Sequence, residues 1–274
     1  MTTVRAALIQ LRTPADQAAA LAQAEPLIRQ AARDGAQFVA TPEASNILQR
    51  ERAKLFAAVR TIDEDVAVQG LRALARELSI TLLIGSALVK RDDGQLANRS
   101  VLIDAEGKIK ATYDKIHMFD VDLPTGERHR ESALYTPGEK AVTADTPWVK
   151  IGLTICYDVR FPQLYRALAK AGAQIITVPA AFTRPTGEAH WEVLLRARAI
   201  ETGAFILAPA QGGLHEDGRG TWGRSIIIGP WGEVLAKADG DEPCVIIADL
   251  ELDEVGKARG AVPALANDRA FAAP

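Results

Sequence analysis

The sequence predicts an α/β fold in which sheets are covered by helices. Strand-like apolar runs alternate with amphipathic helical stretches along the chain, and several runs are apolar throughout instead of alternating with polar residues. A continuously apolar strand is typical of a sheet that is covered on both faces. An internal repeat, described below, further predicts two similar layers.

In the first half of the chain, short apolar runs such as AALIQL and TLLIGSALV predict strands, and longer stretches with helical periodicity predict helices. We expect strands at 6–11, 37–41, 81–89 and 101–104, and helices at 16–33 and 64–78.

The second half follows the same alternation. Strands are expected at 150–155, 174–179, 204–209, 225–229 and 245–249, and helices at 162–171 and 188–202. The segment SIIIGPWGEVLAK predicts a hairpin whose turn is Gly229 to Gly232. The preceding glycine-containing stretch, 212–223, is expected to be an exposed loop, because it lacks the strand-to-helix setting of a phosphate-binding loop.

The internal repeat joins the two halves. Residues 27–43, LIRQAARDGAQFVATPE, align without gaps on residues 164–180, LYRALAKAGAQIITVPA, half the chain length away. Helix-Gly-strand junctions look alike in many proteins, but several identities in one window favour a true internal similarity. Two similar layers should therefore pack face to face around a pseudo-twofold core. Since no Pro-, Ser- or Gly-rich linker separates the halves, we expect one domain over 1–274.

The composition favours a small-molecule partner over a nucleic acid or a membrane. Lys plus Arg number 32 against 35 Asp plus Glu, so the net charge of -3 provides no attraction to nucleic acid or anionic lipid. No apolar run reaches the roughly 20 residues that span a bilayer, and no signal-peptide pattern opens the chain, so a cytoplasmic location is expected. Two cysteines exclude a disulfide scaffold and a cysteine-rich zinc site.

Three ionisable or nucleophilic residues end apolar strands. Cys156 lies between a predicted strand and a predicted helix, a position that exposes a nucleophile at a sheet edge, although a buried structural cysteine fits the composition equally well. Glu43 ends the strand 37–41, where burial would give a general base with a raised pKa. Lys115 alone reads as a solvated loop lysine. Cys244, in CVIIAD, is expected in the core.

Taken together, the three segments FVATPEAS, YDKIHMFDVDLP and GLTICYDVRFPQL resemble the Glu, Lys and Cys signatures of the nitrilase superfamily of carbon-nitrogen hydrolases. Residues 179–211 and 222–236 also resemble its Nit amidase branch, so the likeness covers nearly the entire chain. The resemblance implies a four-layer αββα sandwich. It also implies a homodimer or larger homo-oligomer, and neither a metal nor an organic cofactor. Only the C-terminal VPALANDRAFAAP departs from the usual tail of the family.

The resemblance assigns roles to individual residues. Glu43 is implied as general base, Lys115 as stabiliser of the oxyanion and Cys156 as nucleophile, while Glu131 matches a second glutamate that positions the triad. Glu127 and Glu139 are nearby rivals for this last role. Three residues are implied to contact the substrate. The backbone N–H of Tyr157 would bind the oxyanion, Arg160 would bind a substrate carboxylate, and Phe182 would also lie against the substrate.

The implied reaction is hydrolysis of a small carboxylate-bearing amide to an acid and ammonia. Cys156 would attack as a thiolate, favoured by the nearby ammonium, and Glu43 would protonate the leaving group and then activate water to hydrolyse the thioester. The segments HWEVLLRARAIET and PAQGG resemble deaminated glutathione amidases more than the ω-amidases that act on α-ketoglutaramate. A true nitrilase and a non-catalytic interaction module remain as alternatives.

Two further groups of residues suggest other chemistry. His117, Asp120 and Asp122 could be read as metal ligands, but hydrogen bonds that orient the loop after Lys115 are the preferred interpretation. His190 would suit a Cys-His hydrolase, yet a structural role at the start of a helix is preferred.

Overall fold

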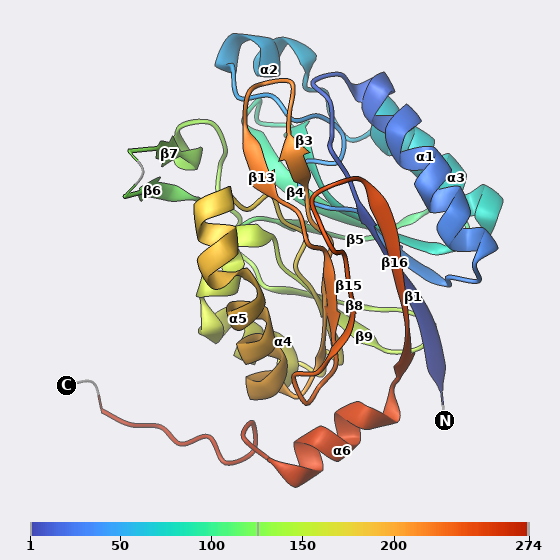
Figure 1. Ribbon diagram of the computed structural model, residues 1–274, viewed down its shortest axis with the longest axis vertical. Helices are drawn as coiled ribbons and strands as arrows, with labels where there is room; N and C mark the ends of the chain where they lie inside the picture. The colour runs from blue at the N-terminus through green and yellow to red at the C-terminus, as the bar shows by residue number, and fades with distance from the viewer. Residues whose placement is uncertain (1, 125, 273–274) are drawn as a thin grey trace.

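The computed structural model describes residues 2–124 and 126–272, in which two six-stranded sheets lie at the centre (Figure 1). The first sheet consists, in spatial order, of β16 (Cys244–Glu251), β1 (Thr3–Gln10), β2 (Phe38–Ala40), β3 (Thr81–Lys90), β4 (Leu96–Ile103) and β5 (Ile109–Asp114). The second consists of β15 (Val234–Lys237), β14 (Ile226–Ile228), β11 (Phe205–Ala208), β10 (Ile175–Thr177), β9 (Lys150–Leu153) and β8 (Val142–Asp145).

The two sheets have the same spatial arrangement of parallel and antiparallel strands, which confirms the predicted internal repeat. In the first, β1, β2 and β3 are parallel, β16 pairs antiparallel with β1, and β4 and β5 add antiparallel strands beyond β3. In the second, β9, β10 and β11 are parallel, β8 pairs antiparallel with β9, and β14 and β15 extend the sheet beyond β11. The aligned segments 27–43 and 164–180 are the corresponding helix–strand units.

Helices cover the outer face of each sheet and complete the four layers. Side chains alternate along each strand, so Ala7, Ile9 and Val39 pack against α1 (Gln17–Arg33) and α3 (Val66–Leu78), while Leu8 and Ala40 face the second sheet. On the other side, α4 (Pro162–Lys170) and α5 (Arg184–Thr202) cover the second sheet (Figure 1). The predicted αββα sandwich is thus confirmed.

Several elements differ from the sequence prediction. β8 was not predicted because it is a short sheet-edge strand with one buried residue, and β5 was noted only as the run that Lys115 ends, because its alternating burial leaves no continuous apolar stretch. The short helices α2 (Arg52–Ala58) and α6 (Asp253–Ala261) were also missed, since few of their residues are buried. The expected loop 212–223 contains a small hairpin of β12 (Gly212–Leu214) and β13 (Gly220–Trp222).

Smaller elements lie near the end of β5. They are the hairpin of β6 (Asp120–Asp122) and β7 (Arg128–Arg130), and two 3₁₀ turns at Glu131–Ala133 and Cys156–Arg160. The predicted hairpin around Gly229 to Gly232 is confirmed as β14–β15. Cys244 was expected in the core but is only half-buried, because it begins the edge strand β16. Among the described residues, no helix is both long and apolar enough to cross a membrane.

Candidate active site

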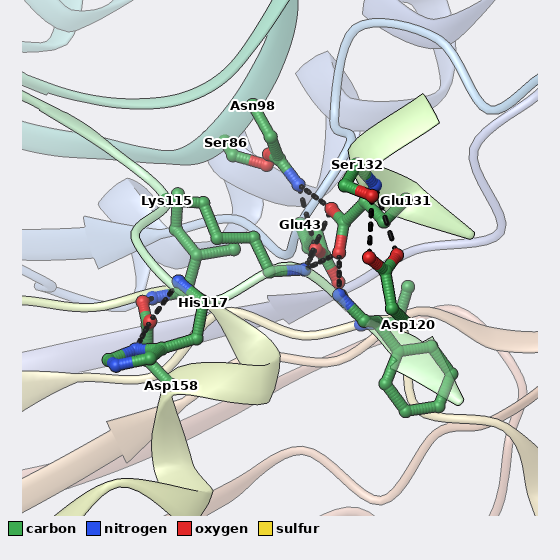
Figure 2. A network of polar contacts seen from close by, with 12 residues as sticks. Glu43, Ser86, Asn98, Lys115, His117, Asp120, Glu131, Ser132 and Asp158 are labelled. Carbon is green, nitrogen blue, oxygen red and sulfur yellow. Dashed lines mark hydrogen bonds and ion pairs between the residues drawn. The ribbon is translucent and has the colours of Figure 1, made fainter. Parts of the chain in front are cut away.

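Three of the four residues expected to be catalytic form one buried polar cluster (Figure 2). Lys115 directly follows β5, and its Nζ lies 2.9 Å from Oε1 of Glu43, which follows β2. The same Nζ lies 2.9 and 2.8 Å from the two carboxylate oxygens of Glu131, which begins a 3₁₀ turn. The Lys115 side chain is only 2% exposed. The resemblance, and not burial patterning, identified this lysine, which alone reads as a solvated loop residue.

Asn98 completes the cluster and was missed by the sequence analysis. Its Nδ2 donates to Oε1 of Glu43 at 2.9 Å and to Oε1 of Glu131 at 3.2 Å, and it is buried in β4. The sequence offered little signal, because Asn98 stands beside two other polar residues, Arg99 and Ser100, in the strand LANRSVLI. Backbone N–H groups also fix the carboxylates, since Ala181 donates to Glu43 at 2.8 Å and Phe119 donates to Glu131 at 2.7 Å.

Cys156 sits at a strained corner between β9 and α4. Its φ of 49° lies in the left-handed region, which costs a non-glycine residue about 1–3 kcal/mol and must be held by the surroundings. Its N–H donates to the carbonyl of Pro179 at 2.8 Å. The following N–H, that of Tyr157, has no acceptor among the described residues and is therefore available to an oxyanion on a substrate.

The buried carboxylate of Asp158 ties this corner to the segment that carries Lys115 (Figure 2). It accepts hydrogen bonds from the N–H of Ile155 at 2.8 Å and from the hydroxyl of Tyr113 at 2.7 Å. It also accepts from the backbone N–H of His117 at 3.2 Å, and His117 Nδ1 lies 2.6 Å away. The two catalytic segments are thus fixed relative to each other.

The charges of the cluster decide its resting protonation. Burial acts to lower the pKa of Lys115, but the charges of Glu131 and Glu43 outweigh burial and raise it well above its usual value. Burial acts to raise the pKa of Glu43, but the charge and hydrogen bond of Lys115 outweigh burial and lower it. The expectation of a raised Glu43 pKa was therefore wrong, because the lysine partner outweighs desolvation.

The pKa of the Cys156 thiol is raised, which opposes the resting thiolate that the resemblance implied. Burial raises its pKa well above the usual value, the charge of Glu43 adds to this effect, and the charge of Lys115 opposes it. The resting site thus pairs a neutral thiol with an ionised Glu43. This arrangement suits proton transfer from sulfur to carboxylate during attack.

A cavity of about 970 Å³ opens onto the cluster. Glu43, Lys115, Glu131 and Cys156 all contribute to its wall, as do Tyr157 and Phe182. Arg160 does not line it. Its guanidinium lies over the rings of Tyr157 and Phe182, at 5.8 and 5.7 Å from their centroids, and its Nη2 is 3.2 Å from Nδ1 of His190. Arg160 is therefore placed behind two aromatic wall residues.

The rival residues have other surroundings. Glu127 and Glu139 are exposed, and neither contacts Lys115, whereas Glu131 does. The three residues of the suspected metal motif contact different partners. His117 contacts Asp158, Asp120 accepts from Ser132, and Asp122 accepts from Arg130. No cluster of potential metal ligands occurs within the described ranges. His190 is exposed inside α5 and does not line the cavity.

Comparison with known proteins agrees with this geometry. The carbon-nitrogen hydrolase family matches residues 5–260. Deaminated glutathione amidase of Yersinia enterocolitica is 40% identical over 98% of this chain and 94% of its own length. Human omega-amidase NIT2 is 36% identical over 98% of this chain and 96% of its own length.

A solved structure of a similar amidase contains a covalent adduct on its own active-site cysteine. A mutant amidase from Nesterenkonia sp. AN1, crystallised with the acetamide moiety of fluoroacetamide covalently added at its active-site cysteine, is 28% identical. The match covers 97% of this chain and 94% of that chain, with a TM-score of 0.81. The two chains therefore share one fold over nearly their whole length.

Proposed function

The chain belongs to the carbon-nitrogen hydrolase family, as its motifs predicted, and from this we propose that it is a cysteine-dependent amidase that hydrolyses deaminated glutathione. The observation that carries the proposal is the buried Glu43–Lys115–Glu131 cluster, which opens onto the same cavity as the strained Cys156. The covalent adduct on the cysteine of the Nesterenkonia amidase supports the same role for Cys156.

In the first half-reaction, Cys156 sulfur attacks the amide carbonyl while the thiol proton passes to Glu43. The developing oxyanion accepts hydrogen bonds from the N–H of Tyr157 and from Lys115, whose ammonium remains charged. Glu43 then gives its proton to the amide nitrogen as the C–N bond breaks. The amine leaves, and the acyl group remains on sulfur as a thioester.

In the second half-reaction, the again ionised Glu43 takes a proton from a water molecule that attacks the thioester. As the C–S bond breaks, the proton returns to sulfur and the carboxylic acid is released. Glu131 and Asn98 do not exchange protons in this scheme. They hold Lys115 and Glu43 in place through the hydrogen bonds described above.

The identity of the amine depends on the substrate. Ammonia, which the sequence analysis gave as the second product, is released only from a primary amide such as α-ketoglutaramate. In deaminated glutathione the amide nitrogen belongs to cysteinylglycine, so this dipeptide leaves instead. The two candidate substrates therefore share an acyl group and differ in the leaving amine. The similarity to an omega-amidase keeps α-ketoglutaramate as the second candidate.

The decisive assay compares both substrates with the wild type and Cys156→Ala. Cysteinylglycine is measured for the first substrate and ammonia for the second. Release of cysteinylglycine by the wild type alone would support the proposal, and a preference for α-ketoglutaramate would move the substrate while retaining the mechanism. Activity on neither amide would reject the substrate assignment and return nitriles and a non-catalytic role to consideration.

We also propose a cytoplasmic homodimer or larger homo-oligomer with a small-molecule amide as its substrate. A reducing compartment would keep the nucleophilic thiol of Cys156 free. Exposed apolar side chains on α5 and the β14–β15 turn offer a surface for a second copy: Val193, Ile200 and Trp231 are 71, 56 and 62% exposed. Light scattering after gel filtration would measure the mass, and a monomer at all concentrations would contradict the proposal.

A further inference from the structure

We infer that the cavity contains a subsite for the terminal carboxylate of a peptide leaving group, formed by Arg50 together with Arg219. Arg50 lies in the segment after Glu43, and Arg219 lies in the turn between β12 and β13. This inference rests on the proposed amidase function and specifies the substrate class of the same site.

Most of the cations around the cavity already face carboxylates of the protein. Besides Lys115 of the buried cluster, five Lys and Arg residues line the wall: Arg50, Lys54, Arg128, Arg130 and Arg219. The ammonium of Lys54 is 2.7 Å from Glu51. Both Arg130, at 2.8 Å, and Arg128, at 3.5 Å, lie against Asp122. Lys54 and Arg130 are therefore the weaker candidates for binding a substrate anion, and so is Arg128, because its side chain is 81% exposed whereas that of Arg219 is 34% exposed.

Arg50 is different because no carboxylate lies within ion-pair distance of it among the described residues. Its side chain reaches the hairpin turn on the neighbouring wall, where Nη2 lies 3.9 Å from the position that a Cβ on Gly218 would occupy. The guanidinium therefore lies beside the residue that immediately precedes Arg219. Two cationic side chains from separate segments are brought to one part of the wall.

The turn that carries Arg219 is held in place from within. The N–H of Arg219 donates to Oδ1 of Asp217 at 2.9 Å, and its carbonyl accepts the N–H of His215 at 2.8 Å. The Arg219 guanidinium forms an ion pair with Asp217, whose Oδ2 lies 3.6 Å from Nη2, but donates no hydrogen bond to it, so its N–H groups can also bind a substrate carboxylate. Glu216, which also lines the cavity, accepts a hydrogen bond from the N–H of Ala15 at 2.9 Å.

The chemistry of a guanidinium selects the ligand. Its planar fork of donors matches a carboxylate, with which it makes paired charge-assisted hydrogen bonds. Cysteinylglycine, the amine in deaminated glutathione, ends in such a carboxylate, whereas the ammonia that leaves α-ketoglutaramate has none. The volume of about 970 Å³ lies at the upper end of the roughly 300–1,000 Å³ of ligand pockets, which suits a tripeptide-sized amide.

The test uses substrates that carry or lack the proposed recognition group. Deaminated glutathione is compared with its C-terminal carboxamide, which has the same length without the anion, and with α-ketoglutaramate. Arg50→Ala is compared with the wild type and with the control Arg52→Ala. The control removes the same charge two positions along the chain, and the Arg52 side chain lies over the ring of Phe56 and does not line the cavity.

We expect Arg50→Ala to raise KM for deaminated glutathione by about 10- to 100-fold, the value of a charge-assisted hydrogen bond. KM for the carboxamide and for α-ketoglutaramate should stay unchanged, as should all three values in Arg52→Ala. The wild-type preference for the free carboxylate over the carboxamide should fall by the same factor in Arg50→Ala, in which Arg219 remains.

Two results would overturn the inference. Equal KM values for deaminated glutathione in the wild type and Arg50→Ala would remove the subsite while leaving the amidase function intact. An equal rise for all three substrates would show that Arg50 supports the cavity wall instead of reading the carboxylate. If the wild type hydrolyses none of the three, the proposed function fails, and the subsite fails with it.

Discussion

Replacing Lys115 by Met should destabilise the protein in a strongly pH-dependent way. The ammonium separates two buried carboxylates, those of Glu43 and Glu131, and lies within 2.9 Å of both. Both carboxylates also accept from one nitrogen of Asn98, so they remain neighbours when the lysine is removed. Two anions about 5 Å apart repel by about 3 kcal/mol at an effective dielectric constant near 20.

The expected loss in the free energy of unfolding is about 3–5 kcal/mol at pH 8, as for other buried ion pairs that lose one partner. In the wild type the pKa of Glu43 is lowered, so its ionisation stabilises the fold above the unfolded-state pKa, and this contribution is lost as the pH falls. In Lys115→Met a carboxyl pKa rises instead, so stability is lost as the pH rises. The deficit should therefore shrink by about 2–3 kcal/mol at pH 5.

Urea unfolding of both proteins at pH 5 and pH 8 measures this effect. Lys90→Met, at the exposed end of β3, is the matched control and should stay within about 0.5 kcal/mol of the wild type at both pH values. An equal deficit for Lys115→Met at pH 5 and pH 8 would refute the reasoning, because it would show that the carboxylates do not interact once the lysine is gone.

Three further predictions concern activity. Cys156→Ala should lower kcat by at least about 10³-fold, because the variant lacks the nucleophile. Its far-UV circular dichroism spectrum should be retained, because the thiol is not needed for the secondary structure. A profile of kcat/KM should be flat from about pH 5 to 9, since Glu43 has a lowered pKa and Lys115 a strongly raised one; a midpoint near pH 7 would contradict this. Asn98→Ala removes a donor to Glu43, so the acidic limb should move to higher pH and kcat should fall about 10-fold or more. Asn46→Ala, which loses a similar buried bond to Asp65 outside the cavity, should leave the limb in place.

The layered architecture could be predicted because it depends on local patterns. Apolar runs that are continuous identify the central strands, and the match of 27–43 to 164–180 identifies the two equivalent helix–strand units. The bounds of edge strands such as β5 and β8 could not be predicted in the same way, because one neighbour and a half-exposed face leave no continuous apolar run.

The candidate site was only partly predictable for a different reason. The positions of Glu43 and Cys156 at strand ends are visible in the sequence, but their protonation depends on Lys115, which is distant in the chain. The roles of Asn98 and Arg50 likewise depend on residues that are distant in the sequence and become neighbours only in the folded chain.

Trapping the thioester tests the central claim most directly. Wild-type protein mixed with deaminated glutathione and quenched in acid should gain the mass of one α-ketoglutaryl group less one hydrogen, and peptide mapping should assign it to Cys156 and not to Cys244. Cys156→Ala should gain no mass and release no cysteinylglycine. Cysteinylglycine release by Cys156→Ala at the wild-type rate would contradict the covalent mechanism, whatever the substrate preference proves to be.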